Sequence, residues 1–377
     1  MNGTNREETR QSNIELLRIV SMCMIIAMHY MTKGMNIPKL SADCSLHNIE
    51  FWIIYAFCVA SVNAYVLISG YFDAGSKWSI GRVIRLWLEV LFYSILIPVI
   101  MNAFGMIDLK ALDLSIRQQI FLPVTYEHYW FASSYVMMYL FAPVLSSAAD
   151  KLDKKKLGMV IIALLVVFCG FKSVIPYLIP WDKYGNDVIW FMILYLIAGY
   201  IRNYGIPVID SGIMKNRYEM SKDGKKSAGR KGLIVYISFS LITFAIAYVT
   251  SHIVRLTGKM EYYMDMTYCY NYVTVLIASI GLFYVFLMID LKADKLINRI
   301  AGCTFGIYLF HENIILRGLW PDIPGMTDSY GRWWQLLHML LCIAIIFVVG
   351  CIVDIIRKYI FDLVSTQFGK IKDHSEK

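Results

Sequence analysis

The sequence predicts an all-α protein, a polytopic bundle of about ten transmembrane helices with both termini in the cytoplasm. Of its 377 residues, 58% are hydrophobic and only 17% are charged, whereas an average soluble domain has about 25% charged residues. The apolar residues fall into blocks of about 20, the length that a helix needs to cross a bilayer core. Lys and Arg are also distributed unequally between alternate loops. These three observations indicate an integral membrane protein.

Ten apolar blocks are expected to span the membrane. They cover roughly residues 13–32, 48–71, 82–104, 128–148, 157–180, 186–204, 232–254, 268–290, 297–316 and 334–360. We expect one transmembrane domain, residues 1–360, and a polar tail, residues 361–377. The longest connection, 205–231, is polar and basic and is predicted to be a cytoplasmic loop without regular structure. The first block is not predicted to be a cleaved signal peptide, because no small-residue cleavage site follows it.

The positive charges predict the orientation. Of the 36 Lys and Arg residues, 25 lie in one set of alternate loops and termini, 9 lie in the other set and two lie within spans. The positive-inside rule places the richer set, with both termini, in the cytoplasm. The net charge of +8 therefore reflects topology, and no nucleic-acid partner is predicted. The lipid bilayer is the expected environment, in a multi-pass protein of the plasma membrane.

The eight cysteines do not indicate a metal site. None forms a CxxC pair, and seven lie inside apolar blocks, where Cys behaves as a small hydrophobe. We therefore expect neither a bound metal nor a disulfide framework.

The first span carries polar residues that need an explanation. Arg18 and His29 are eleven residues apart, which places them on one face of a helix, close to three full turns apart. An ionisable group in the membrane is costly, so such residues usually face a cavity or a partner. We expect both to line one continuous cavity, Arg18 on its inner side. Glu15 is expected to pair with Arg18 at i,i+3. Alternatively, Arg18 reaches the lipid phosphates and His29 is bonded within the bundle.

Arg82 and Arg85 form a second basic pair, at the inner end of the third span. They are one helical turn apart and share a face. Arginine binds phosphates bidentately and stays charged, so this pair can hold a phosphorylated ligand at the cytoplasmic mouth. The alternative is ordinary anchoring to lipid headgroups.

Five stretches, in order, resemble the acyltransferase family 3 membrane proteins. The first is SNIELLRIVSMCMIIAMHYM, residues 12–31, with the family's basic residue, ten intervening residues and His; Glu15 stands where the family often has Asp. The others are VNAYVLISGYF (62–72), Arg82-x-x-Arg85, HYWFASSYVMMYLFAP (128–143) and GIYLFHE (306–312). The resemblance covers essentially the whole chain. It favours the branch associated with exopolysaccharide and capsule acetylation, because Tyr135, Val136 and Met137 replace the Glu-Glu-Gln of another branch.

The resemblance implies an O-acyltransferase. Acetyl-CoA is the expected donor, and the acceptor is a hydroxyl of a surface polysaccharide or of its lipid-linked sugar precursor. His29 is the expected general base, and Arg18 is expected to orient the thioester or the CoA phosphates. The same resemblance makes Arg82 and Arg85 the expected CoA-binding pair.

Weaker candidates are expected to contact the substrates. They are Glu15, His128, Trp130, Tyr139, His311 and Glu312. Trp130 is equally typical of an aromatic belt at the membrane interface. The pair His311 and Glu312 is equally typical of the capped end of a span.

Two other classes of function remain open. A transporter or flippase of a small molecule or glycan precursor uses polar intramembrane residues equally well. A non-catalytic partner in a glycan assembly complex is the third possibility. Transfer of acetyl from acetyl-CoA to glycan in vesicles distinguishes the first class from the other two.

Overall fold

The computed structural model describes residues 11–73, 78–176, 182–210, 220–320 and 332–375, and within these ranges the chain forms helices and no strands. The N-terminal half consists of α2 (Ser12–His29), the π-helical turn η1 (Tyr30–Gly34), α3 (Leu46–Cys58), α4 (Ala60–Asp73), α5 (Ile80–Ala103), α6 (Leu114–Phe121) and α7 (Trp130–Lys151). There follow α8 (Lys154–Leu165), η2 (Val166–Gly170), α9 (Phe171–Val174), α10 (Val188–Tyr204), α11 (Pro207–Asp210) and α12 (Lys222–Thr257). The last elements are α13 (Glu261–Met266), α14 (Val273–Leu287), α15 (Lys295–Ala301), α16 (Thr304–His311), η4 (Leu316–Gly318) and α17 (Arg332–Ser375).

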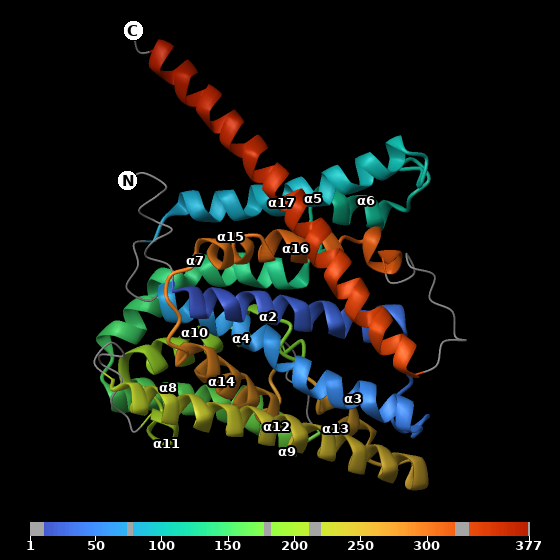
Figure 1. The fold of residues 1–377 in the computed structure, drawn as a ribbon, viewed down its shortest axis with the longest axis vertical. Coiled ribbons are helices and arrows are strands. Elements are labelled where there is room, and N and C mark those ends of the chain that lie inside the picture. Colours follow the sequence, from blue (N-terminus) through green and yellow to red (C-terminus); the bar gives the residue numbers. More distant parts are fainter. Residues whose placement is uncertain (1–10, 74–77, 177–181, 211–219, 321–331, 376–377) are drawn as a thin grey trace.

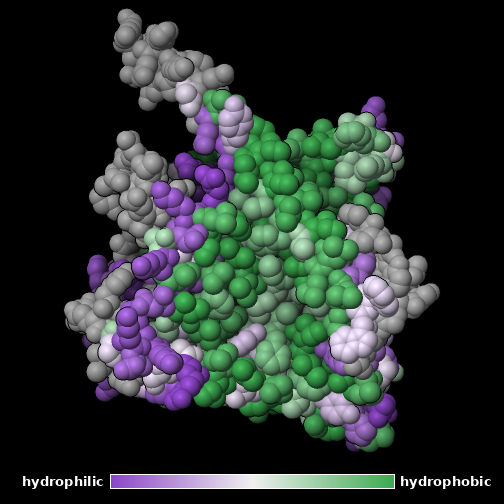
Figure 2. All heavy atoms as spheres, viewed as in Figure 1, coloured by the Kyte–Doolittle hydropathy of each residue, from purple (hydrophilic) through white to green (hydrophobic). Residues whose placement is uncertain are grey.

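The helices form a bundle whose long members run side by side, with α5 on one flank, α12 on the other and α2 and α4 between them (Figure 1). The helix α17 crosses the bundle obliquely, and its C-terminal end projects beyond the other helices (Figure 1). Figure 2 shows a broad hydrophobic surface on this face, bounded on its left and right by hydrophilic residues. A belt of this kind matches the bilayer and its two aqueous sides, so the all-helical, multi-pass membrane architecture is confirmed.

Asp side chains at the N-caps explain where several helices begin. Asp187 accepts a hydrogen bond from the backbone N–H of Trp190 at 2.9 Å and opens α10. Asp153 does the same for α8, and Asp294 for α15. Each cap satisfies a backbone donor that has no partner within its own helix.

Glycine permits a close contact between α12 and α14. Gly232 of α12 and Gly281 of α14 face one another, and a Cβ atom on Gly281 would lie 2.6 Å from the backbone nitrogen of Tyr236. Small residues at such crossings let two backbones approach, which is how helices gain van der Waals contact within a membrane.

In the described part of the chain, eight helices are long and apolar enough to span a membrane, fewer than the ten predicted. Two predicted spans account for the difference. The segment 268–290 contains α14, which has only 15 residues. The segment 297–316 is divided into α15 and α16 by a turn at Gly302 and Cys303. A broken helix is tolerated at membrane depth when protein covers it, and α16 packs against α2, α5 and α17.

The expected loop 205–231 is partly helical, which corrects the prediction. Pro207–Asp210 forms α11, and α12 already begins at Lys222, capped by Ser221; residues 211–219 lie outside the described residues. The polar tail predicted from residue 361 likewise continues α17 as far as Ser375. The polar residues from Lys222 to Lys231 and from Asp362 to Ser375 thus continue the apolar parts of α12 and α17.

Candidate active site

The C-terminal end of α2 carries the histidine that the sequence singled out. His29 is the last residue of α2, and the π-helical turn η1 follows it directly. Such turns occur frequently at functional sites. Lys33, four residues after His29, lies in this turn and reaches the same carboxylate as His29 does.

The partner of His29 comes from the C-terminal end of α16. His29 Nδ1 lies 3.0 Å from His311 Nε2 and 3.1 Å from Glu312 Oε1. Lys33 forms an ion pair with the same carboxylate. The Glu312 side chain is only 4% exposed, and that of His29 14%. A charge this buried needs close partners, and Glu312 has two, His29 and Lys33.

The hydrogen bonds fix the tautomer of His29. His311 Nδ1 lies 2.7 Å from the carbonyl oxygen of Ile307, so this nitrogen carries the hydrogen and donates. In a neutral imidazole the other nitrogen then has a lone pair, so His311 Nε2 accepts from His29 Nδ1. His29 Nδ1 is therefore protonated, and its Nε2, bonded to no other described residue, keeps a free lone pair.

The same cluster has the donor set of a metal site. One nitrogen of each histidine and a Glu312 oxygen all lie within 4.8 Å of one another, and two His with one Glu is a known zinc set. Lys33, however, occupies both oxygens of Glu312. An ammonium group bonded to this carboxylate repels a divalent cation, so the arrangement fits a charge-stabilised imidazole better than a metal.

His29 lines a small pocket of about 20 Å³ together with aromatic residues. Trp130, one of the predicted substrate residues, lies in its wall and stacks on Tyr270, with ring centroids 5.7 Å apart. The apolar side of the pocket is formed by Met22, Ile25 and Val62. The pocket thus gives the His29 side chain an apolar, aromatic neighbourhood.

A much larger pocket of about 790 Å³ lies between α2, α5, α7 and the C-terminal part of α17. Ligand pockets typically have about 300–1,000 Å³. Four basic residues line it, Arg18, Arg85, Arg357 and Lys358, with the acidic residues Glu89 and Asp362. The excess of positive charge suits an anionic ligand.

The basic wall on α17 is held rigidly. Arg357 donates to Asp354 at 2.8 Å and to Glu89 at 3.0 Å. Lys358 pairs with the second oxygen of Asp354 at 2.8 Å, and Tyr93 donates to the first at 3.0 Å. Side chains locked in this way present a charged surface with little loss of conformational freedom on binding.

The large pocket contains only one residue of the predicted arginine pair. Arg85 lies in its wall, whereas Arg82 donates to the hydroxyl of Tyr139 at 3.1 Å and is not among the lining residues. The structure thus places Tyr139 beside Arg82, away from the His29 cluster. Arg18 and Glu15 form the expected pair, at 3.7 Å.

The structure corrects the expectation of one continuous cavity. Arg18 lines the large pocket and His29 the small one, and neither residue lines both. The two pockets adjoin at Tyr65, Phe131 and Phe305, which line both. Helix geometry places Arg18 and His29 on one face, but aromatic rings from α4, α7 and α16 fill the space between them.

His128, which stays a predicted substrate contact, is buried and bonded within the protein. Its Nδ1 lies 3.1 Å from both the Ser94 hydroxyl and the Gln119 carbonyl oxygen, and its Nε2 accepts from the backbone N–H of Ile314 at 2.8 Å. Both ring nitrogens thus contact other groups of the protein. His128 instead anchors the segment that follows Glu312.

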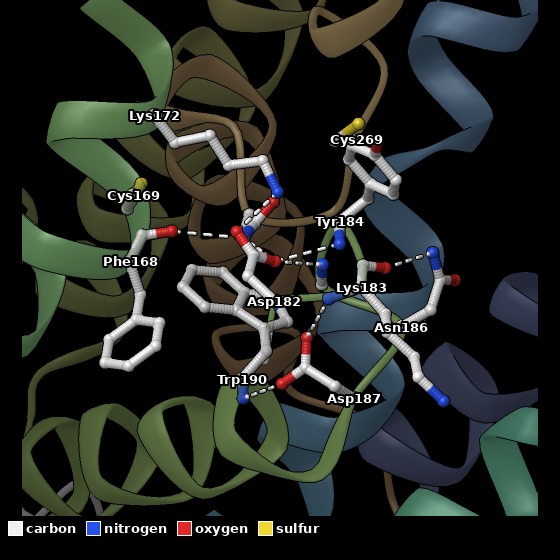
Figure 3. Close-up of polar contacts among 12 residues, drawn as sticks. Phe168, Cys169, Lys172, Asp182, Lys183, Tyr184, Asn186, Asp187, Trp190 and Cys269 are labelled. Carbon is white, nitrogen blue, oxygen red and sulfur yellow. Dashed lines mark hydrogen bonds and ion pairs between the residues drawn. The ribbon is translucent and has the colours of Figure 1, made fainter. Parts of the chain in front are cut away.

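A second buried ion pair fixes the aromatic wall of the small pocket. Lys172 and Asp182 pair at 2.5 Å, and each side chain is 2% exposed. Figure 3 shows Asp182 at the centre of a network of polar contacts that includes Lys172 and the backbone of Tyr184. Asp182 also accepts from Asn271 at 3.0 Å, the residue that follows Tyr270. The network therefore holds the segment that carries the Tyr270 ring.

Sequence reasoning missed Lys33, Arg357 and Lys358. Lys33 had a local signal, its i,i+4 spacing from His29, which puts both on one side of a helix. Arg357 and Lys358 lacked one, because they fall where the last span meets the cytoplasm and basic residues are expected there anyway. The sequence did single out His311 and Glu312, but as substrate contacts and not as partners of His29.

The chain matches the family model described as an acyltransferase domain over residues 11–357, and it therefore belongs to acyltransferase family 3. The match covers nearly the whole chain and includes every residue that lines the small pocket, and those of the large pocket except Lys358 and the α17 residues after it. No curated protein and no solved structure matches the chain.

Proposed function

We propose that this membrane acyltransferase moves an acetyl group from cytoplasmic acetyl-CoA to a hydroxyl of an extracytoplasmic or lipid-linked glycan, with His29 as the general base. The observation that carries the proposal is the hydrogen-bonded cluster of His29, His311 and Glu312. A base whose second nitrogen is held by a carboxylate is the arrangement that activates hydroxyl nucleophiles in unrelated enzymes.

The cluster can perform each proton transfer of the reaction. His29 Nε2 accepts the hydroxyl proton of the acceptor while the alkoxide oxygen attacks the thioester carbonyl carbon. The resulting imidazolium is stabilised by Glu312, whose carboxylate lies 3.1 Å from Nδ1. When the tetrahedral intermediate collapses, the C–S bond breaks and the CoA thiolate takes the proton from His29. The products are an acetyl ester and CoA–SH.

The large basic pocket supports CoA as the donor. CoA carries a 3′-phosphate and a pyrophosphate, and Arg side chains bind such groups bidentately. Arg18, Arg85, Arg357 and Lys358 all line this pocket. It adjoins the His29 pocket at the shared aromatic residues, so only these rings separate a thioester held there from His29.

The glycan acceptor rests on the family resemblance and on one aromatic pair. Trp130 stacks on Tyr270 beside His29, and aromatic faces of this kind pack against the apolar faces of sugar rings. The branch of the family that the sequence resembles acts on surface polysaccharides. The small pocket, of about 20 Å³, has no room for a sugar ring. We therefore place only the reacting hydroxyl of the acceptor at His29, and CoA on the Arg18 side of the aromatic residues.

The proposal is tested with the purified protein in proteoliposomes, ¹⁴C-acetyl-CoA and surface polysaccharide isolated from the same cells and deacetylated by mild base. We expect label in the polysaccharide and stoichiometric release of CoA–SH. His29→Gln should lower both rates by about 10²–10⁴-fold, whereas His252→Gln, at an exposed position on α12, should not. Uptake of polysaccharide precursor without CoA release would instead show a transporter.

A further inference from the structure

Three aromatic rings separate the two pockets of the site. Tyr65 of α4, Phe131 of α7 and Phe305 of α16 line both the large basic pocket and the small His29 pocket. Two of them are in contact with each other: the Phe131 ring meets the Tyr65 ring edge-on at 5.7 Å, and the Tyr65 hydroxyl lies 2.9 Å from that of Thr304. The small pocket therefore begins where the large one ends.

The two pockets differ greatly in size. The large one has about 790 Å³ and the small one about 20 Å³. A volume of roughly 10–15 Å³ on this measure is the space of one water molecule. The His29 pocket consequently has room for one small group, comparable to a methyl group, and not for a hydrocarbon chain.

The far wall of the small pocket is apolar and tightly packed. Met22 and Ile25 of α2 and Val62 of α4 are 2%, 5% and 3% exposed. All three belong to the same buried core as the surrounding helices. Interiors packed in this way resist the insertion of extra methylenes.

We infer that the pocket formed by Met22, Ile25 and Val62 receives the alkyl part of the acyl group and restricts the donor to acetyl-CoA. This inference rests on the proposed function, because the thioester carbonyl must reach His29 Nε2 from the large pocket. Its alkyl substituent then enters the small pocket beside the imidazole. A methyl group fits there, whereas the longer chain of a butyryl group overlaps the side chains of α2 and α4.

The expected discrimination is large enough to measure. One additional methylene in a hydrophobic pocket typically changes kcat/KM by about 10–200-fold. Butyryl-CoA has two more methylenes than acetyl-CoA, so the wild-type protein should prefer acetyl-CoA by at least about 100-fold. The bonds formed and broken are the same for both donors. The ratio of the two kcat/KM values therefore reports only how well the acyl group of each donor fits the small pocket.

Two pairs of variants test the role of the wall. Val62→Ala and Ile25→Ala enlarge the small pocket. Val66→Ala and Ile26→Ala make the same deletions on the same helices, at buried positions that line neither pocket. The measured quantity is the ratio of kcat/KM for acetyl-CoA to that for butyryl-CoA, from CoA–SH release in proteoliposomes with deacetylated polysaccharide. The ratio is taken within one protein sample, so partial misfolding cancels.

We expect Val62→Ala and Ile25→Ala to shift this ratio toward butyryl-CoA by about tenfold or more, and the two control variants to leave it within about threefold. Equal use of both donors by the wild-type protein, or equal shifts in the lining and control variants, would overturn the inference and leave the proposed function standing. Absence of CoA release with either donor would refute the proposed function and the inference with it.

Discussion

The carboxylate of Glu312 lies 3.1 Å from Nδ1 of His29, although one residue ends the first long helix and the other follows the short helix α16. This contact links the two ends of the chain at one buried point. It also explains how the polar pair His311-Glu312 is accommodated inside an apolar bundle: His311 contacts His29, and Glu312 contacts His29 and Lys33.

Replacement of Glu312 by Gln should impair catalysis more than stability. The amide keeps the shape of the carboxylate but removes the negative charge that stabilises the His29 imidazolium. We expect kcat to fall by about 10²–10⁴-fold with little change in KM for acetyl-CoA, measured by CoA–SH release in proteoliposomes. Glu312→Asp should retain more activity than Glu312→Gln, because its charge survives.

The control for this change is Glu127→Gln, which removes an exposed carboxylate paired with Lys183. It should leave kcat unchanged. A Glu312→Gln protein with wild-type kcat would show that His29 does not depend on this carboxylate.

Arg85 and Arg82 should differ in their contribution to CoA binding, although the sequence presents them as equals. Arg85 lines the large basic pocket and Arg82 is bonded to Tyr139. Since charge-assisted hydrogen bonds to phosphate are strong, Arg85→Ala should weaken CoA binding by about tenfold or more. Arg82→Ala should change it by less than about threefold. Isothermal titration of the detergent-solubilised proteins with CoA measures both; equal losses would place the phosphates elsewhere.

The buried pair of Lys172 and Asp182 should be important for stability. Asp182→Asn leaves the Lys172 ammonium without its charge partner at a site that is 2% exposed, and breaking such a pair typically costs about 3–5 kcal/mol. The midpoint of thermal unfolding in detergent should fall accordingly. The double variant Lys172→Met, Asp182→Asn should recover much of the loss, because it removes both buried charges and keeps an oxygen that accepts from Asn271 and Tyr184.

The exposed pair of Lys183 and Glu127, whose side chains are 58% and 53% exposed, is the matched comparison. Removing it with Lys183→Ala should change stability by no more than about 1 kcal/mol. Similar unfolding midpoints for Asp182→Asn and Lys183→Ala would contradict a structural role for the buried pair.

The sequence predicted the elements that depend on local pattern and missed those that depend on packing. The long apolar helices, the Glu15–Arg18 pair and the shared face of Arg18 and His29 all follow from helical period and hydropathy. The break between α15 and α16 does not, because a short buried helix has the same apolar composition as a span.

In the candidate site, too, local features could be predicted from the sequence and contacts between distant segments could not. His29, His311 and Glu312 could each be singled out as polar residues in apolar surroundings. Their contact could not be predicted, since it depends on how α16 packs against α2. The aromatic residues between Arg18 and His29 were likewise hidden, because Tyr65, Phe131 and Phe305 look like ordinary core residues in their own helices.

Chelation should leave the reaction unaffected. Lys33 already binds both oxygens of Glu312, so the three-residue cluster should act without a divalent ion. Activity measured by CoA–SH release should be unchanged after dialysis against EDTA and 1,10-phenanthroline. A loss that added Zn²⁺ restores would show that the metal displaces Lys33 and that His29 is a ligand and not a base.

The charge distribution predicts which side of the membrane each end of α12 faces. This helix runs from Lys222 to Thr257, with exposed lysines near both ends, Lys226 and Lys259. The positive-inside rule places Lys226 in the cytoplasm and Lys259 outside. In a background without native cysteines, Lys259→Cys should react with a membrane-impermeant maleimide on intact cells, and Lys226→Cys only after permeabilisation. The two sites flank one helix, so they serve as controls for each other. The opposite pattern would put the large basic pocket on the outer side, where acetyl-CoA is absent, and the proposed direction of transfer would then be wrong.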